Sequence, residues 1–444
     1  MTGMGQVWVD LTDLNNWKGH MTGIQRVVYN VAKEYHRNDA AKFFAYNPEL
    51  GFSEVDFGQI SLRFDVIDDD QQAAGTEQGR SLRNRKDLLV SRSKRLTKRT
   101  AKLVYRKSPR RARVLAKEIY VKRVVTSKTI VSKGDIQHPF KKGDTILIPG
   151  ASWHHHTLIT DIGYLKTKLD LKIAHIIYDL IPVLFPEYFG QGFGDVYTKH
   201  MFNVFAVTDH ALAISENTKK DSIAFLNEMK LPKIEVSTFR LGDDPISSKL
   251  AGTPPKGVQL SPNEYVHAVG TFEIRKNYLL LYNVWKKALL TGKKLPKLVI
   301  VGQPGWLSGD VSLLMNFDMN ARKSIVVLHD ADDSQLMWLY KNCMFTVYPS
   351  FYEGWGLPIA ESLNYGKLCL ASNTSSMPEI GKSLIDYFDP YDVKECLRLI
   401  NEYSTNPKML KEKEQQIKTQ YKPAEWAGAY QECKKATDGL SCIC

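Results

Sequence analysis

The sequence predicts an α/β protein with two doubly wound domains, each built on a parallel sheet. The chain has 444 residues, about three times the length of a typical domain, so two domains of roughly 200 residues each are expected. Short apolar segments alternate with amphipathic helical patterns in both halves of the chain. Because strands that alternate with helices form parallel sheets covered on both faces, each half is predicted to be Rossmann-like.

The first domain is predicted to span residues 1–250. It opens with a strand over residues 6–11, a polar loop that reaches Gly23, and a helix over residues 24–35. This is the first strand-loop-helix unit of a nucleotide-binding fold. The loop lacks the full Gly-x-Gly-x-x-Gly pattern, so by itself it is weak support for phosphate contact. Further strands of this domain are predicted at residues 42–46, 145–149, 172–178 and 210–214.

The second domain is predicted to span residues 251–421, after a polar stretch over residues 252–257. The final segment, residues 422–444, contains a predicted helix over residues 423–435. The strands of the second domain are predicted at residues 265–269, 297–301, 325–328, 344–348 and 368–371.

The composition is that of a globular protein. Hydrophobic residues make up 43% of the chain and charged residues 24%, which excludes a largely disordered or fibrous chain. No stretch approaches 18 consecutive apolar residues, and residues 1–6 lack the charged and apolar regions of a signal peptide. We therefore expect a cytoplasmic protein.

The cysteines predict neither a metal site nor a disulfide framework. All six lie from Cys343 onward, without a Cys-x-x-Cys pair or a histidine at ligand spacing. The last two, Cys442 and Cys444, are expected to lie in a loose tail.

One basic insertion in the first domain gives the chain its positive charge. Residues 80–128 contain nineteen Lys or Arg and only the acids Asp87 and Glu118, a net charge of +17 that leaves −5 for the remaining residues. The apolar residues between these charges predict one or two amphipathic helices. Three roles stay open: attraction to an anionic membrane surface, a solvated helical hairpin, or nucleic-acid binding. We favour the membrane, because only Tyr105 and Tyr120 could stack on bases.

Two carboxylates lie eight positions apart around a predicted strand-to-helix turn. Glu353 lies in the turn after the strand at 344–348, and Glu361 lies on the following helix. Gly354 and Gly356 suit a tight turn, and Pro358 suits the first helical turn. The start of a helix offers unpaired N–H groups to a phosphate, and carboxylates accept hydrogen bonds from sugar hydroxyls. This pattern predicts a sugar-nucleotide site, with an ordinary capped turn bearing two surface acids as the alternative.

Cations follow another strand of the same domain. Arg275 and Lys276 come shortly after the strand at 265–269, at the carboxyl edge where open α/β sheets bind ligands. A guanidinium fork and an ammonium could meet the phosphates of a leaving diphosphate. The alternative is an exposed ion pair with Glu273.

These motifs resemble the retaining glycosyltransferases of family GT4, which have the two-domain GT-B fold. The pattern Pro-Ser-x-x-Glu-Gly-Trp-Gly-Leu-Pro at residues 349–358, with its Glu-x7-Glu spacing, carries the resemblance. It is strong from residue 265 to 390 and covers most of the chain except about residues 50–140. The other matching segments are residues 22–27, 177–182, 214–218, 269–277 and 300–306.

The resemblance implies roles for individual residues. Glu353 would contact the transferred sugar and Glu361 the ribose hydroxyls, while Arg275 and Lys276 would bind the diphosphate in a metal-independent enzyme. Same-face attack is expected, so Glu353 is not assigned as a nucleophile. The remaining donor-site candidates are Gly270 and the backbone of Gly354, Trp355, Gly356 and Leu357. The resemblance also implies a GT-B cleft between the domains and a final helix that crosses back onto the first one.

The acceptor side is expected to come from the first domain. Asp179 ends a predicted strand and could orient the acceptor hydroxyl, with a turn-initiating aspartate as the alternative. Many family members have His before this Asp, whereas this chain has Tyr178, so that histidine's role does not transfer. Gly23, Arg26, His154 and Tyr178 itself are further candidates for the acceptor side. His154 begins a run of three histidines, but adjacent residues of an extended segment point to opposite faces, which argues against a metal site.

The combined interpretation is a retaining transferase that moves a hexose, with mannose from GDP-mannose as the best guess, onto a lipid-linked or polysaccharide acceptor. The expected partners are therefore a nucleotide sugar, a glycan and, through residues 80–128, the anionic inner face of the cell membrane, with no cofactor, metal or nucleic acid. The alternatives are another GT-B chemistry that uses a UDP-sugar, such as epimerisation, and a basic membrane- or nucleic-acid-binding scaffold with a degenerate transferase core.

Overall fold

The computed structural model describes residues 5–17, 21, 23–70, 136–155, 157–243 and 252–441. The chain divides into two compact units, of which one comprises residues 1–60 and 137–444 and contains two sheets. Of the other unit, residues 61–136, the described part is the end of one helix and residue 136. The predicted basic insertion at 80–128, His156, Cys442 and Cys444 lie outside the described residues.

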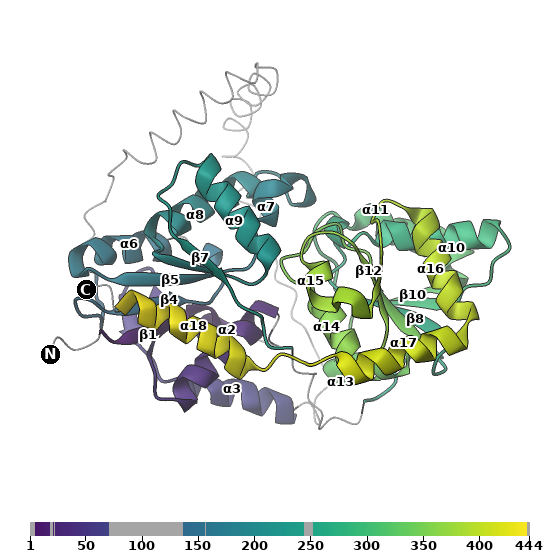
Figure 1. Cartoon of the computed structure of the whole chain (residues 1–444), viewed down its shortest axis with the longest axis horizontal. Coiled ribbons are helices and arrows are strands. Elements are labelled where there is room, and N and C mark those ends of the chain that lie inside the picture. Colours follow the sequence, from purple (N-terminus) through teal and green to yellow (C-terminus); the bar gives the residue numbers. More distant parts are fainter. Residues whose placement is uncertain are drawn as a thin grey trace, which may run out of the picture. The chain divides into compact units, whose positions relative to one another are not determined.

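The first sheet has seven strands in the order β3-β2-β1-β4-β5-β6-β7 (Figure 1). All neighbouring strands are parallel except β3, which pairs antiparallel with β2. Its five predicted strands are present. The sequence analysis missed β3 and β7, which are the two edges of this sheet. The strands are β1 (Val7–Asp10), β2 (Lys42–Asn47), β3 (Gly51–Glu54), β4 (Thr145–Ile148), β5 (Lys172–Ile177), β6 (His210–Ala213) and β7 (Glu235–Thr238).

Helices connect the strands of the first sheet. The most amphipathic pattern is that of α2, which buries Val27, Val28, Val31 and Tyr35 along one side. The helices are α1 (Thr12–Asn16), α2 (Gly23–Arg37), α3 (Phe57–Asp70), α6 (Leu158–Leu169), α7 (Ile181–Leu184), α8 (Phe193–Val207) and α9 (Glu216–Glu228), with short 3-10 turns η2 (Ser152–His154) and η3 (Pro186–Tyr188).

The second sheet has six parallel strands in the order β10-β9-β8-β11-β12-β13. Its five predicted strands are present within one residue at each end, and the edge strand β13 was not predicted. The strands are β8 (Tyr265–Val269), β9 (Lys297–Val301), β10 (Ile325–Leu328), β11 (Phe345–Tyr348), β12 (Cys369–Ser372) and β13 (Asp386–Phe388).

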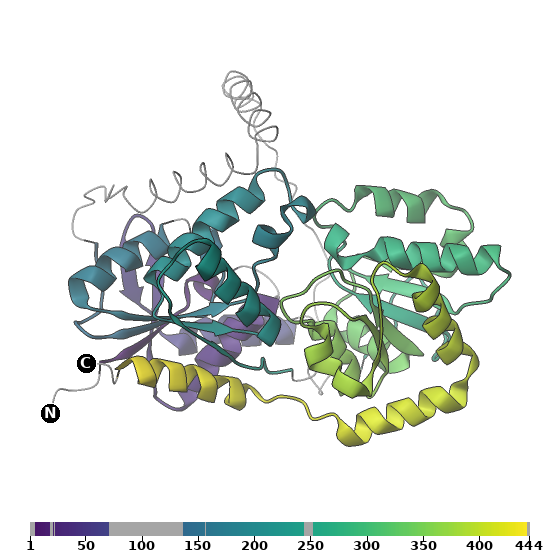
Figure 2. The same cartoon turned by 45° about the horizontal axis from the view of Figure 1, so that its top comes forward.

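The second sheet is also connected by helices (Figure 2). Among them, α13 begins with a capping box in which Asp332 and Gln335 bond each other's backbone N–H groups. The helices are α10 (Tyr278–Leu290), α11 (Gly309–Phe317), α12 (Ala321–Ser324), α13 (Asp333–Asn342), α14 (Leu357–Asn364), α15 (Met377–Gly381), α16 (Val393–Thr405) and α17 (Pro407–Gln420), with 3-10 turns η4 (Ile274–Lys276) and η5 (Lys382–Leu384).

Each sheet has one point where the strand order reverses. In the first sheet it lies between β1 and β4, and in the second between β8 and β11. The loops that leave two such strands diverge to opposite faces and open a crevice at their carboxyl ends, where α/β sheets bind ligands. The second of these points carries the predicted donor-site motifs.

The last helix, α18 (Trp426–Ser441), packs against α2 and the first sheet (Figures 1 and 2). The Tyr35 ring of α2 meets the Tyr430 ring edge-on, with centroids 4.9 Å apart. The Tyr35 hydroxyl lies 3.2 Å from Thr437 Oγ1. Thr145 Oγ1 of β4 lies 3.0 Å from Ser441 Oγ of α18. The predicted domain boundaries at residues 250 and 421 stay a prediction.

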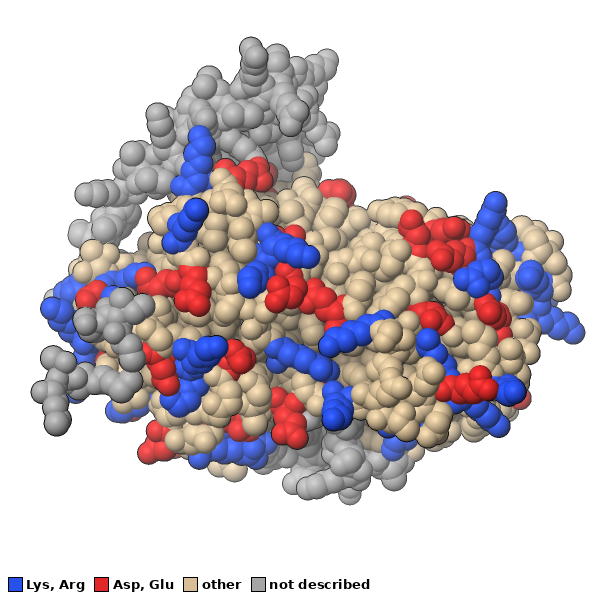
Figure 3. Space-filling model, viewed as in Figure 1, with Lys and Arg blue, Asp and Glu red and all other residues tan. Residues whose placement is uncertain are grey.

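Charge and hydropathy agree with a globular chain in the described part. Lys and Arg are interspersed with Asp and Glu over the face seen in Figure 3, as expected when residues 80–128 hold the excess positive charge. None of the described helices is long and apolar enough to span a bilayer. Cys343, Cys369, Cys396 and Cys433 are buried free thiols, and burial raises the pKa of Cys369 to about 12.

Asp243 fastens the segment after β7 to the segment that leads into α18. Its buried carboxylate accepts hydrogen bonds from Ala424 N and the Tyr421 hydroxyl, and from Arg240 Nη2 at 2.8 Å. Its backbone N–H donates to Ala424 O at 3.0 Å. Gly242 packs under the Trp426 indole, where a Cβ atom would lie 2.5 Å from the ring.

We expect Asp243→Ala to lower the free energy of unfolding by about 2–4 kcal/mol, because it leaves buried donors without their carboxylate. Chemical denaturation of the whole chain measures this loss. The control is Glu402→Ala, which breaks the exposed Arg398–Glu402 pair of α16 and should change stability by less than about 0.5 kcal/mol. Equal effects of the two substitutions would contradict the assigned role.

Candidate functional site

The predicted donor-site residues meet at the reversal point of the second sheet. Arg275 and Lys276 lie in η4, in the loop that leaves β8, and Glu353 lies in the loop that leaves β11. Because β8 and β11 are neighbours, the two loops leave the same edge of the sheet. Phe351 N donates to Arg275 O at 2.9 Å, which joins the loops through their backbones.

Two residues shape the loop after β8. Gly270 has a φ of 144°, a conformation that favours glycine, and its carbonyl accepts a hydrogen bond from the Tyr278 hydroxyl at 2.8 Å. Asn277 is left-handed at a φ of 56°. Its side-chain amide donates to Pro349 O at 3.1 Å and Pro390 O at 2.8 Å, so η4 is tied to two loops of the same edge.

Glu353 is the centre of a buried ion cluster. Its Oε1 accepts hydrogen bonds from Lys276 Nζ at 2.7 Å and from the Tyr348 hydroxyl at 2.9 Å. Its Oε2 pairs with Arg275 Nη1, and Arg275 Nη2 lies 3.2 Å from Glu273 Oε2. The side chains of Glu353 and Arg275 are only 8% and 16% exposed, so an exposed ion pair with Glu273 does not describe this arrangement.

The cluster keeps Glu353 ionised. Burial favours the neutral acid, but Arg275 and Lys276 outweigh burial and lower the pKa of Glu353 to about 2. Burial lowers the pKa of Lys276, and Glu353 opposes this effect. Burial would also lower the pKa of Arg275, yet Glu353 and Glu273 raise it. The site therefore holds charged donors and charged acceptors within a few residues of the sheet edge.

Gly354 and Gly356, which follow Glu353, are each required to be glycine for a different physical reason. A Cβ atom on Gly354 would clash with the carbonyl oxygen of Tyr178, from the loop after β5. Gly356 has a φ of 136° and precedes α14, with Pro358 in the first turn. Trp355 is buried, and its indole Nε1 has no hydrogen-bond partner in the described part of the chain. The start of α14 presents its first backbone N–H groups at this edge.

Glu361 lies on α14, outside the ion cluster. Its Oε2 accepts a hydrogen bond from the Tyr340 hydroxyl at 2.7 Å, and its Oε1 lies 3.9 Å from Arg26 Nη1. Arg26 Nη2 also lies 3.8 Å from Asp333. A Cβ atom on Gly23 would lie 3.5 Å from Leu357. The structure thus places two residues predicted for the acceptor side next to residues predicted for the donor.

Asp179 is partly buried and follows β5. Its Oδ1 accepts a hydrogen bond from Ile181 N at 3.0 Å, which is the turn-initiating role named as the alternative. Burial raises its pKa, and Arg275 opposes this shift, which places the two groups within electrostatic reach. The neighbouring Tyr178 side chain donates to Pro149 O at 2.5 Å, so its hydroxyl is engaged at the end of β4.

His154 is exposed on η2 and packs against Trp153, with ring centroids 5.5 Å apart. Among the described residues its ring contact is with Trp153, which lies outside the Glu353 cluster. The buried histidine nearby is His175 of β5, whose Nε2 lies 3.3 Å from Ser152 Oγ. Burial lowers the pKa of His175 to about 3. No group of three or more His, Cys, Asp or Glu able to hold a metal occurs in the described ranges.

The sequence analysis missed Asp13, which lies after β1 at the reversal point of the first sheet. It is buried, and its Oδ2 accepts a hydrogen bond from Gln25 Nε2 at 2.9 Å. Gly150, after β4, leaves it room, since a Cβ atom there would lie 3.2 Å from Asp13 Cβ. Burial raises the pKa of the nearby Asp10 to about 6. The sequence offered one signal for Asp13, which is that an acidic residue follows the first predicted strand.

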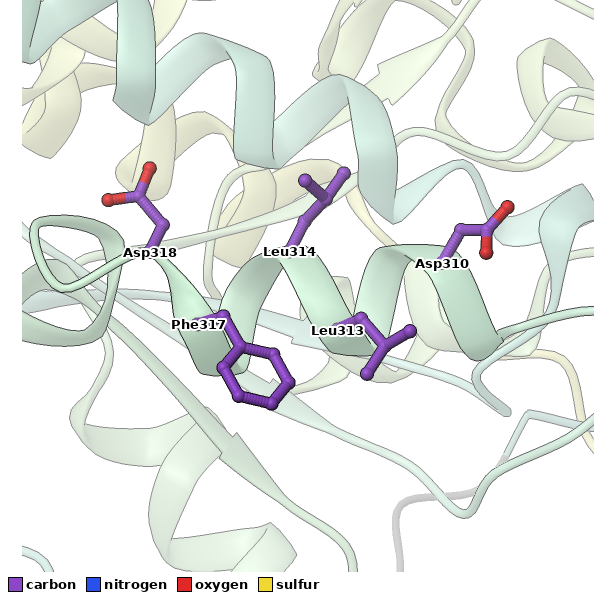
Figure 4. A pocket seen from close by; sticks show the side chains of 5 residues that line it. All are labelled: Asp310, Leu313, Leu314, Phe317 and Asp318. Atoms are coloured by element: carbon purple, nitrogen blue, oxygen red, sulfur yellow. The ribbon is translucent and has the colours of Figure 1, made fainter.

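An open surface pocket of about 420 Å³ lies along α11 and is lined by residues of α11 and by Asp318, which follows it. Figure 4 shows Leu314 and Asp318 on one side of the helix and Leu313 and Phe317 on the other. Phe317 is 78% exposed. None of the predicted site residues lines this pocket, so the Glu353 cluster stays the candidate site.

The second half of the chain matches a known family. Residues 255–422 match the family model described as glycosyl transferases group 1. The serotype-specific mannosyltransferase WbdA of Escherichia coli is 25% identical over 265 residues, which cover 58% of this chain and 32% of WbdA. The O-antigen chain mannosyltransferase B of Escherichia coli is 27% identical over 233 residues, 52% of this chain and 60% of that protein. The aligned part of the chain therefore spans about a third of WbdA.

Solved structures match nearly the whole chain. The Anabaena protein Alr3699/HepE, solved in complex with UDP, has a TM-score of 0.56 at 13% identity and covers 98% of this chain and 100% of its own. A glycosyltransferase from Rickettsia africae has a TM-score of 0.56 at 12% identity, with 99% and 100% covered. The predicted GT-B fold is confirmed, and residues 255–422 within it carry the resemblance to glycosyl transferases group 1.

Proposed function

We propose that this protein transfers a hexose from a nucleotide diphosphate sugar to a glycan in polysaccharide synthesis. The observation that carries the proposal is the Glu353 carboxylate held by Lys276 and Arg275 at the reversal point of the second sheet. This edge is where α/β folds bind nucleotides. The family match over residues 255–422 supports the same reaction class.

The cations are proposed to bind the leaving diphosphate. Arg275 offers a planar fork and Lys276 a point charge, both preorganised by buried contacts. When a diphosphate binds, these cations would be shared between its oxygens and Glu353. They supply the positive charge that the departing group needs, so we propose a metal-independent reaction.

The carboxylates are proposed to bind the sugar and the nucleotide. An ionised Glu353 accepts hydrogen bonds from hydroxyls of the transferred sugar and stabilises positive charge that develops at its anomeric carbon. Glu361, outside the ion cluster, is proposed to bind the ribose hydroxyls. The N–H groups at the start of α14 and the turn at Gly270 would complete the donor site. Attack on the same face as the departing phosphate would retain the anomeric configuration.

Mannose from GDP-mannose is the proposed donor, supported by two relatives that are named mannosyltransferases. A lipid-linked or polysaccharide glycan is the proposed acceptor. We also propose a cytoplasmic protein at the inner face of the membrane, which rests on the net charge of +17 over residues 80–128.

The donor assignment is tested by calorimetric titration with GDP-mannose, UDP-glucose, UDP-galactose and UDP-N-acetylglucosamine, followed by transfer assays with the nucleotide sugar that binds. GDP-mannose should bind most tightly, and transfer should persist in excess EDTA. Preference for a UDP-sugar would replace the donor. Loss of transfer in EDTA that manganese restores would refute metal independence.

Substitution of Glu353 and substitution of Glu361 should change different kinetic parameters. Glu353→Gln should lower kcat by about 10²–10³-fold, because its contacts strengthen as charge develops. Glu361→Gln should raise the donor KM by about tenfold or more with little change in kcat, because a ribose contact binds ground and transition states alike. Steady-state kinetics separate the cases, and thermal melts confirm that each variant is folded. Wild-type kinetics in either variant would remove that residue from the site.

Activity should also depend on the ionisation of Asp179. Burial raises its pKa above the ordinary 3.8, and the ionised carboxylate accepts a stronger hydrogen bond from the acceptor hydroxyl than the neutral acid does. We therefore expect kcat/KM to fall as the pH drops through this raised pKa, while Glu353, with a pKa of about 2, stays ionised. Asp179→Asn should abolish this acid limb, and the control Asp10→Asn should keep it. An unchanged limb in Asp179→Asn would contradict the assignment.

A further inference from the structure

Four aromatic rings form a continuous stack beside the loop that carries Glu353. Phe185 and Tyr188 have centroids 5.3 Å apart and ring planes at 15°. Tyr188 and Phe351 follow at 6.0 Å and 18°, and Phe351 and Tyr391 at 5.0 Å and 30°. The stack ends at Tyr391, whose residue is 74% exposed, so its outer surface faces solvent.

Trp306 forms a second exposed aromatic surface. It lies 5.7 Å from the Phe193 ring and 6.4 Å from the Phe189 ring, measured between centroids. Gly190 makes room for the indole, since a Cβ atom there would lie 2.6 Å from it. Trp306 remains 44% exposed. Its position is therefore fixed by packing while much of its surface stays in water.

Both exposed rings are attached to the turn that carries the catalytic cations. Ile274 N donates to Trp306 O at 3.3 Å, and Asn277 Nδ2 donates to Pro390 O, next to Tyr391, at 2.8 Å. The segment 274–277 holds Arg275 and Lys276 between these two bonds. Trp306 and Tyr391 thus lie at opposite ends of the segment that forms the Glu353 ion cluster.

Exposed aromatic rings beside a charged site match the chemistry of sugar rings. A pyranose presents C–H groups on its faces and hydroxyls around its edge. The C–H face packs on the negative face of an aromatic ring, and the hydroxyls bond polar groups nearby. A lipid tail would favour one contiguous apolar surface, whereas Trp306 and Tyr391 lie in separate loops, one after β9 and the other after β13.

We propose that Trp306 and Tyr391, which we call the aromatic rim, bind pyranose units of the glycan acceptor. The proposal rests on the proposed function, because it assigns the donor to the buried residues around Glu353. The acceptor chain must then enter from solvent past the exposed rings at the two ends of η4. The inner rings of the stack hold Tyr391 in place, which limits the entropy lost when a sugar binds.

Calorimetric titration of the full chain with α-mannotetraose, maltotetraose and chitotetraose tests the rim. At least one should bind the wild type, and Tyr391→Ala and Trp306→Ala should each weaken that binding by about tenfold. Tyr391→Phe should retain most of it. The matched control is Phe317→Ala, which removes an exposed aromatic ring from α11 and should leave binding unchanged.

Nucleotide-sugar titrations of the same variants separate this proposal from the proposed function. Donor affinity should be unchanged in both alanine variants. Failure of any nucleotide sugar to bind the wild type would refute the proposed function, yet the tetrasaccharide titrations would still decide the rim. Wild-type tetrasaccharide binding by the alanine variants, or no tetrasaccharide binding by the wild type, would overturn the rim. An equal loss of donor affinity in the alanine variants would also overturn it.

Discussion

The candidate site depends on one buried carboxylate and the two cations that hold it. An isolated ionised Glu353 at 8% side-chain exposure would be strongly unfavourable, because water can no longer solvate its charge. Lys276 and Arg275 compensate that loss, and the Tyr348 hydroxyl supplies a further hydrogen bond. The same contacts hold the loops after β8 and β11 against each other. The same ion pairs therefore stabilise the charge of Glu353 and fix the positions of the two loops at this edge.

Residues from the first sheet complete the surroundings of this edge. The carbonyl of Tyr178 approaches Gly354 so closely that only glycine fits there. The carboxylate of Glu379, on α15, accepts hydrogen bonds from Glu216 N and Asn217 N at the start of α9, both at 2.8 Å. A carboxylate at a helix N-terminus satisfies unpaired N–H groups and the positive end of the dipole. These contacts couple α9 to the second sheet by charge.

The buried ion cluster and the exposed aromatic rim have different roles in the proposed reaction. Buried groups around Glu353 suit a ligand whose charge and hydroxyls must be matched one by one, such as a nucleotide sugar. The exposed rings of Trp306 and Tyr391 suit a polymer that is held through repeated, similar faces. The division follows from burial, because a preorganised ion cluster discriminates strongly while an exposed ring tolerates different sugars of similar shape.

The sequence by itself determined ten of the thirteen strands in the described part of the chain, including the edge strand β10, and the residue types of the donor motif. Apolar runs, glycine turns and motif spacing are local properties. The sequence did not reveal β3, β7 and β13. All three are sheet edges, and β7 has no fully buried residue, so their pairing came from neighbouring strands and not from an apolar pattern. The sequence also singled out Glu353, Arg275 and Lys276 without indicating that they bind one another. Only the tertiary structure placed Arg26 beside Glu361, Asp13 beside Gly150, and Trp306 and Tyr391 at the ends of η4. Such neighbours are decided by the order of strands in each sheet, which depends on packing between segments far apart in the chain.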